Sequence, residues 1–217
     1  HVKNTYRVVM VMAAAALAVT LLLAQAPGRG QAPAPTPTAV AEREKALKSK
    51  RITQQLQANG RVPTVFDRQG KVVTTVGEPA VYDDLVISPD GTQVAVSRVN
   101  LETRTADVWV VDVDTGNSTR ITTSQPREGS GTPVWSPDGT QVAYWALRRG
   151  YTGIYRKASN GTGTEELLYQ HPGANLGLRD WSLDGRFLSF STTDLSGGTL
   201  YALPLAGSGE RKPIVVF

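Results

Sequence analysis

Residues 136–139 read Ser-Pro-Asp-Gly, and the same four residues stand at 88–91. A third copy, Ser-Leu-Asp-Gly, stands at 182–185, so successive copies begin 48 and 46 residues apart. A recurrence at this period is typical of repeat folds, in which each repeat buries its apolar faces against its neighbours. The three copies therefore predict three successive structural repeats.

Strand-like segments surround each copy. A large apolar residue precedes it, and apolar residues return three and five positions after its glycine with a small residue between them. This alternation gives a strand one buried face. After each alternating segment come a run with a central aromatic residue and then a short closing run. Each unit is therefore predicted to form four short antiparallel strands. The preceding residues are Ile87, Trp135 and Trp181; the alternating triplets are 94–96, 142–144 and 188–190; the aromatics are Trp109, Tyr155 and Tyr201; the closing runs are 120–122, 166–169 and 212–217.

The repeated residues themselves have the chemistry of a tight turn. Proline presets φ, aspartate binds nearby backbone groups through its side chain, and glycine adopts a left-handed conformation. A ligand or metal site is the alternative use of a repeated aspartate. Because the same residue recurs in every unit, we interpret these positions as structural turns between the innermost strand and the next one out. They are Asp90, Gly91, Asp138, Gly139, Asp184 and Gly185.

From about Thr64 to the C-terminus, the sequence resembles the repeats of TolB-like β-propellers, relatives of the WD-repeat propellers. The resemblance rests on VWSPDGTQVAYW at 134–145 and on GIYRKASNGTGTEELL at 153–168. The runs at 65–91, 106–116 and 133–144, taken together, resemble the propeller of bacterial receptor-like serine/threonine kinases and of secreted relatives. Leu183 and Ile87 depart from the pattern. The resemblance implies an all-β propeller of four-stranded antiparallel blades and says little about function.

Residues 1–32 differ from the rest of the chain. Lys3 and Arg7 precede an apolar run at 8–24, and small residues follow it. This pattern is typical of a secretory signal peptide, while a run of this length also fits a membrane anchor; a buried core helix is a third interpretation. The first two place the remainder in the periplasm or outside the cell, with residues 8–24 as its only contact with a membrane.

Residues 33–60 predict an alanine- and proline-rich linker that ends near Thr38, followed by a short helix over 39–60 with a thin apolar stripe. The propeller is expected over 61–217. A hairpin at 64–76 supplies the outer half of one blade, and the three copies supply three more blades. About three and a half blades fall short of a closed ring. We therefore expect a fragment of a longer protein, in which strands from the far C-terminal end complete the first blade, as the resemblance implies.

Known catalytic patterns are missing from the sequence. The chain has no cysteine, no G-x-S-x-G, and only two histidines, His1 and His171. Asp112–Asn117 begins like a calcium loop but lacks its closing glutamate, so a turn is favoured. The net charge of +4 comes mostly from residues 1–32, which carry three of the basic residues and no acid. We expect no catalytic residue, cofactor or metal, and no nucleic-acid partner.

Binding is the remaining function class. In a propeller of this kind, the connections between second and third strands and those between blades gather on one face, here called the loop face. Variable loops on a rigid scaffold are where binding usually occurs. The sequence predicts an exported, non-catalytic scaffold that binds a protein or a small ligand there; solvated hairpin tips are the alternative for any single residue. Two other functions stay open: the gating propeller of a prolyl-oligopeptidase-like serine peptidase, and the sensor of a receptor kinase. The candidate contact residues are Arg98, Asn100, Arg148, Arg149, Tyr151 and His171.

Overall fold

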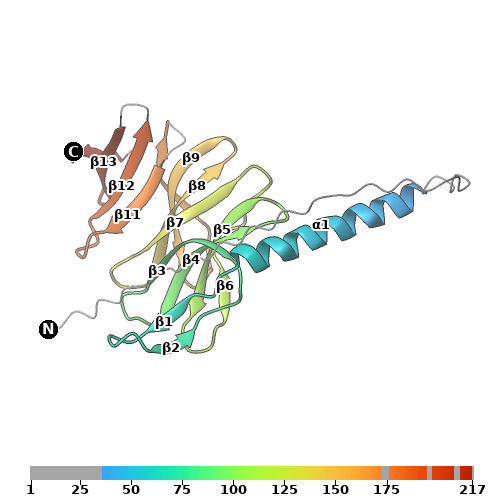
Figure 1. Cartoon of the computed structure of the whole chain (residues 1–217). Coiled ribbons are helices and arrows are strands. Elements are labelled where there is room, and N and C mark those ends of the chain that lie inside the picture. Colours follow the sequence, from blue (N-terminus) through green and yellow to red (C-terminus); the bar gives the residue numbers. More distant parts are fainter. Residues whose placement is uncertain (1–35, 173–175, 195–196, 208–210, 217) are drawn as a thin grey trace, which may run out of the picture.

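The computed structural model describes residues 36–172, 176–194, 197–207 and 211–216. Its strands form antiparallel sheets that follow one another like a fan (Figure 1). The fold is that of a partial β-propeller, as the repeats predict. Helix α1 spans Pro37–Asn59 and precedes a two-stranded sheet of β1 (Thr64–Phe66) and β2 (Val72–Thr75).

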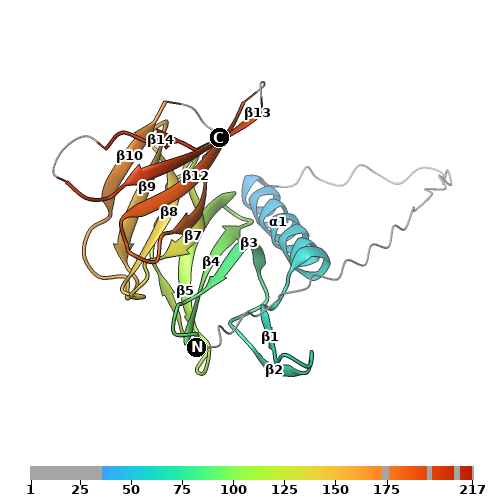
Figure 2. The ribbon, with the colours of Figure 1, turned by 90° about the vertical axis from the view of Figure 1, so that its left-hand side faces the viewer.

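Three four-stranded sheets follow, and in each the strands are neighbours in sequence order. We call them blades 1, 2 and 3. The second view shows them stacked from β3 to β13 (Figure 2). Blade 1 holds β3 (Val81–Ile87), β4 (Gln93–Asn100), β5 (Thr105–Asp112) and β6 (Ser118–Arg120); blade 2 holds β7 (Gly129–Trp135), β8 (Gln141–Arg148), β9 (Tyr151–Ala158) and β10 (Glu166–His171); blade 3 holds β11 (Leu176–Trp181), β12 (Phe187–Asp194), β13 (Gly197–Pro204) and β14 (Ile214–Val215).

The repeated turns join the first two strands of each blade and share one set of hydrogen bonds. In blade 2, Ser136 Oγ donates to Asp138 Oδ1 at 2.6 Å, and the backbone N–H of Thr140 donates to the same oxygen at 3.0 Å. Blades 1 and 3 repeat both bonds. The third turn keeps them although Leu183 replaces the proline and is 85% exposed. Serine, aspartate and glycine therefore suffice for this turn.

The core lies between successive sheets, because every blade leaves an apolar face that its neighbour covers. Ala95 of blade 1 faces a cluster that includes Trp135 and Tyr144 of blade 2. Ala143 of blade 2 belongs in the same way to the cluster that holds Trp181 and Phe190 of blade 3. The small residue of each copy thus leaves room for the aromatic residues of the next blade. In blade 3 this position is Ser189, on a face that no described sheet covers.

The innermost strands are also tied to one another directly. Each of β3, β7 and β11 carries a register shift, and that of β7 falls between Gly131 and Val134. Within this irregular segment, the N–H of Thr132 donates to Asp84 Oδ2 at 3.3 Å, while its hydroxyl accepts from the N–H of Leu178 at 3.0 Å. Thr132 therefore links three blades. The Trp135 indole adds a bond to the Val86 carbonyl at 3.0 Å.

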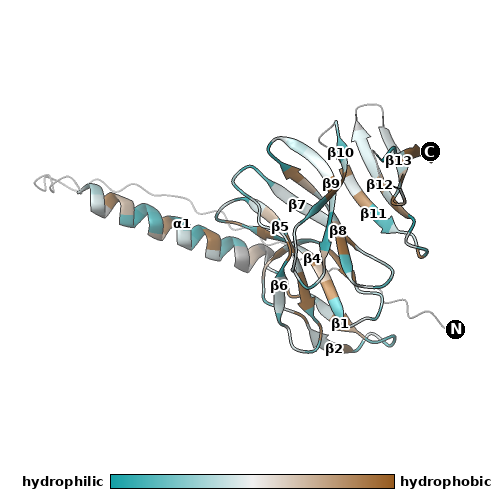
Figure 3. Ribbon diagram, turned by 180° about the vertical axis from the view of Figure 1, so that it is seen from behind, coloured by the Kyte–Doolittle hydropathy of each residue, from teal (hydrophilic) through white to brown (hydrophobic). Residues whose placement is uncertain are grey.

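Helix α1 begins at Pro37, inside the segment expected to be an extended linker. A proline is tolerated at the first helical position because its missing N–H would be unpaired there anyway. Leu47 is 51% exposed, and hydrophobic residues are scattered along the helix without a continuous stripe (Figure 3). Among the described residues, no helix is long and apolar enough to cross a membrane. The apolar run at 8–24 lies outside the described residues.

Replacing Gly161 with alanine is expected to destabilise the fold more than replacing Gly163. Both glycines have positive φ, +78° and +72°, so alanine strains the backbone similarly, by about 1–2 kcal/mol. A Cβ at Gly161 would lie 2.8 Å from Cγ2 of Thr119 in blade 1, whereas nothing lies within 4 Å at Gly163. The extra loss should appear as a melting temperature lower by about 2–4 °C per kcal/mol. Equal melting temperatures would contradict the close approach of the two blades.

The repeated turns should make stability depend on pH. Hydrogen bonds from the serine and from the residues after the glycine lower the pKa of Asp90, Asp138 and Asp184. Their stabilisation is therefore present above the ordinary value of 3.8 and is lost as the pH falls through the lower folded value. The triple aspartate-to-asparagine variant should melt below the wild type at pH 6, with the gap closing below pH 3.8. Asp114→Asn is the control, and a gap independent of pH would contradict this account.

Candidate functional site

The candidate contact residues lie at the ends of the blades opposite the repeated turns. Strands β4 and β8 run away from their turns and end at Asn100 and Arg148. The hairpin tips that follow, and the end of β10 at His171, therefore lie on the loop face. The structure separates these residues into three places: Arg98 with Asn100 on blade 1, Arg148 to Tyr151 on blade 2, and His171 at the outer edge of blade 2.

Arg148 is engaged within its own blade and does not extend from it. Its Nε donates to Glu165 Oε1 at 3.1 Å, and a terminal nitrogen donates to Ser130 Oγ at 3.0 Å. A second carboxylate, that of Glu128, lies 4.0 Å away. Glu165 also accepts from the hydroxyl of Tyr144, whose pKa is raised by burial and by this charge. The guanidinium expected to be free for bidentate binding is thus an internal link, because Glu165, in the connection between β9 and β10, pairs with it.

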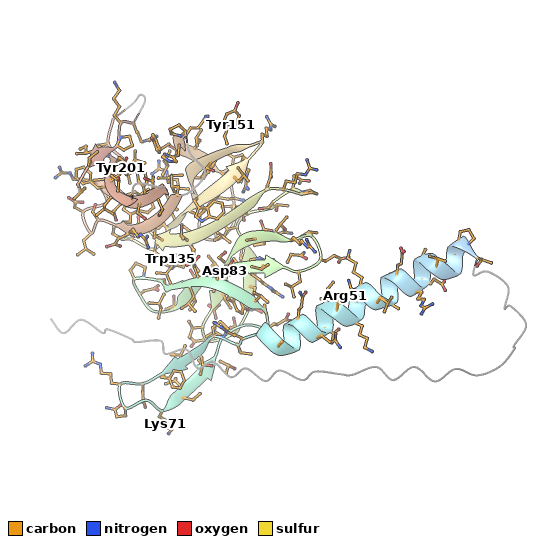
Figure 4. All side chains as sticks on the ribbon, turned by 45° about the horizontal axis from the view of Figure 1, so that its top comes forward. Arg51, Lys71, Asp83, Trp135, Tyr151 and Tyr201 are labelled. Carbon is orange, nitrogen blue, oxygen red and sulfur yellow. The ribbon has the colours of Figure 1, made fainter. Side chains whose placement is uncertain are left out.

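Arg149 and Tyr151 occupy the exposed tip of the β8–β9 hairpin. Tyr151 is 61% exposed and stands at the outer end of blade 2, far from the helix residue Arg51 (Figure 4). Arg149 has φ +51° and holds the turn through its N–H, which donates to Glu128 Oε1 at 3.2 Å. The tip therefore offers a cation and an aromatic ring on a fixed backbone, the residue types enriched in binding hot spots.

His171 differs from the other candidates in having a buried ring nitrogen without a partner. Its Nδ1 is buried and has no hydrogen-bond partner, and its ring lies 6.1 Å from that of Tyr169. Burial lowers the pKa of this imidazole, so it is neutral near pH 7. A neutral, half-buried ring fits packing against Tyr169 better than attraction of an anion.

Arg98 belongs to a cluster on one face of blade 1 that the sequence pattern does not predict. Strand pairing sets Arg98 opposite Asp107 and Trp109 opposite Arg120. The guanidinium carbons of both arginines lie 5.6 Å from the centre of the Trp109 ring. Asp107 and Trp109 are two residues apart in a strand, which does predict a shared face. The arginines join them only through the register of three strands, and the sequence alone does not fix that register.

Asp107 fixes Arg120 in this cluster. Its side chain is 4% exposed and accepts from Arg120 at 2.6 Å and from the Thr122 hydroxyl at 2.9 Å. Arg120 Nε in turn donates to the Thr122 carbonyl at 2.9 Å. Arg98 has a weaker link, an ion pair of 3.8 Å with Glu78, whose side chain is 81% exposed. The cluster therefore contains one rigid and one loosely paired guanidinium.

A pocket of about 380 Å³ opens over this cluster, between blade 1 and α1. Asn100 lines it together with Arg98 and Trp109, while Asn100 Oδ1 accepts from the N–H of Glu102 at 2.9 Å and so shapes the β4–β5 hairpin. Ile52 of α1 forms the opposite wall, and Lys48 of the same helix pairs with Glu102 at 3.1 Å. The volume lies within the range of small-ligand sites.

Two further acidic features of the structure have local explanations. Asp112 accepts from the N–H and hydroxyl of Thr115 at 2.8 and 2.7 Å, which is the turn expected at 112–117. Asp83 lies on the innermost strand β3; the residue is exposed, but partial desolvation of its carboxyl group, and then the charge of Asp84, raise its pKa. Among the described residues, no group of three or more histidine, aspartate and glutamate side chains could hold a metal ion.

Comparison with known proteins supports the fold. No family model matches the chain. A stretch of 103 residues is 34% identical to the uncharacterized peptidase YuxL of Bacillus subtilis, covering 45% of this chain and 15% of that protein. TolB from Acinetobacter baumannii superposes with a TM-score of 0.57 at 20% identity, over 73% of this chain and 39% of that one.

Two other solved structures also superpose on this chain. A proposed TolB from Agrobacterium tumefaciens gives a TM-score of 0.58 at 24% identity, over 73% of this chain and 58% of its own. A prolyl endopeptidase gives 0.52 at 16% identity, over 82% of this chain and 35% of its own. This chain thus spans less than two thirds of each of these relatives. Together with the stacked four-stranded blades, these likenesses show that the chain has the fold of a TolB-like β-propeller.

Proposed function

We propose that this protein is an exported, non-catalytic propeller that binds a protein or a small ligand on its loop face. The observation that carries the proposal is the contrast between the two ends of the blades. One end holds three matching turns whose polar groups bond to one another. The other end presents the exposed tip of Arg149 and Tyr151 and the pocket beside Arg98.

Rigid support favours binding at these positions. The tip rests on β8, whose side chains from Val142 to Tyr144 are buried, and Arg148 ties its base to Glu165 and Ser130. A backbone held in this way loses little freedom when a partner binds, so more of the contact energy remains as affinity. The basic start and the apolar run at 8–24 are the reason for placing this binding in the periplasm or outside the cell.

A second candidate function is the gating propeller of a serine peptidase. The identity with YuxL favours it, as does the fold shared with a prolyl endopeptidase. In that case the loop face or channel of this chain would control access to a catalytic domain outside the sequence given. The sensor of a receptor kinase stays a prediction from the sequence resemblance.

Substitution of the exposed tip tests the binding role. In a pull-down from an extract of the producing cells, the Arg149→Ala/Tyr151→Ala variant should recover at least about tenfold less of the partner than wild type, because hot-spot residues each contribute more than about 1 kcal/mol. Leu183→Ala, which changes a side chain 85% exposed on the opposite face, should recover the wild-type amount. Equal recovery by the tip variant would contradict binding at this tip, and peptide hydrolysis by the purified full chain would contradict a non-catalytic role.

A further inference from the structure

We propose that the pocket between α1 and blade 1 binds an acidic peptide, with one carboxylate held by Arg98 and Arg120 and an adjoining aliphatic side chain against Ile52. This assigns a ligand chemistry to one part of the loop face, and it rests on the proposed binding role. The sequence alone does not predict that Arg120 or Trp109 belongs to a binding site.

The charges of the pocket favour a carboxylate. Arg98 and Arg120 lie beside the same indole ring, and the buried carboxylate of Asp107 neutralises only one of them. The other partner of Arg98 is Glu78, which is 3.8 Å away and mostly exposed. An exposed pair of this kind contributes about 1 kcal/mol or less. An incoming carboxylate can therefore replace Glu78 at little cost and gain the stronger, better aligned bonds of a guanidinium.

The walls of the pocket favour a peptide over an acidic sugar or a phosphate. Ile52, Val99 and Leu101 line it, so an aliphatic side chain next to the acid has apolar surface to cover. A sugar would need an open aromatic face to stack on, but both arginines already lie over Trp109. Glu78, which pairs with Arg98, and Glu102, which lines the pocket, disfavour a doubly charged phosphate, although Lys48 offsets Glu102. A singly charged carboxylate beside a leucine-like side chain fits these surroundings.

The ligand would bridge two parts of the chain that otherwise contact each other sparsely. In the part of α1 whose side chains the structure describes, Lys48 pairs with Glu102, and Ile52 faces the pocket. The Lys48 and Glu102 side chains are 57% and 65% exposed, so their pair adds little stability. A peptide seated on Ile52 and on the arginines would add contacts to both sides.

The test is a titration in which the full chain is added to a fluorescein-labelled Leu-Glu-Leu-Glu peptide and binding is measured as fluorescence anisotropy. Binding should be saturable below millimolar concentration. Arg98→Gln should weaken it about tenfold or more, since a hydrogen bond to a charged group contributes about 1.5–3 kcal/mol. Glu78→Gln should tighten it about two- to fourfold, because the competing carboxylate is gone. Arg120 is left intact, since its loss would leave buried Asp107 without its cation.

Matched controls separate this site from general charge attraction. Arg186 also lies over an aromatic ring, 5.3 Å from the centre of Phe187, but on the turn face. Arg186→Gln should bind like wild type. With both peptides C-terminally amidated, so that neither has a terminal carboxylate, Leu-Gln-Leu-Gln should not bind. Three results would overturn the proposal. They are absence of peptide binding, equal weakening by Arg98→Gln and Arg186→Gln, and tighter binding of an acidic sugar, trigalacturonate, than of the peptide. If one of these results is obtained, capture of a partner that depends on Arg149 and Tyr151 would still support the proposed function.

Discussion

The burial of each sheet against the next is the constraint on which the rest of this structure depends. A single four-stranded sheet leaves two apolar faces, and only stacking removes them from water. Ala95 and Ala143 make the stacking close, because their small side chains admit the aromatic residues of the following blade. Thr132 then joins β3, β7 and β11 by hydrogen bonds. The two ends of the blades are consequently fixed relative to each other, and a loop on either end is carried by a rigid base.

This architecture places the repeated stabilising turns and the residues proposed to bind at opposite ends of the blades. The turn end uses the same serine and aspartate three times, and its polar groups are satisfied locally, which leaves little for a partner to bind. The loop end has no such repeat: one hairpin presents Tyr151, and another forms a pocket with α1. Because the core does not depend on these tips, their residues can change without loss of the fold, as is usual for loops on a rigid scaffold.

The fold could be predicted from the sequence, while only part of the candidate site could. The spacing of the Ser-x-Asp-Gly copies and the alternation after each glycine were enough to place four strands per blade. Arg148 shows the limit: its place beside a hairpin tip predicts an exposed side chain, yet Glu165 engages it from a neighbouring loop. Arg120 and Trp109 were missed for the same reason, since strand register, set by packing over many residues, decides which side chains meet across a sheet. Local turn chemistry needs no such information.

Amide hydrogen exchange of the full chain tests most directly whether rigid, mutually buried blades support an accessible loop face. Strand β8, covered by blades 1 and 3, is expected to exchange slowest, while residues 101–104, 149–150 and helix α1 exchange orders of magnitude faster. Slow exchange shared by α1 and β8 would show the helix to be part of the core. Fast exchange throughout blade 2 would show that the sheets do not stabilise one another, and would contradict the claim that mutual burial of the blades makes them rigid.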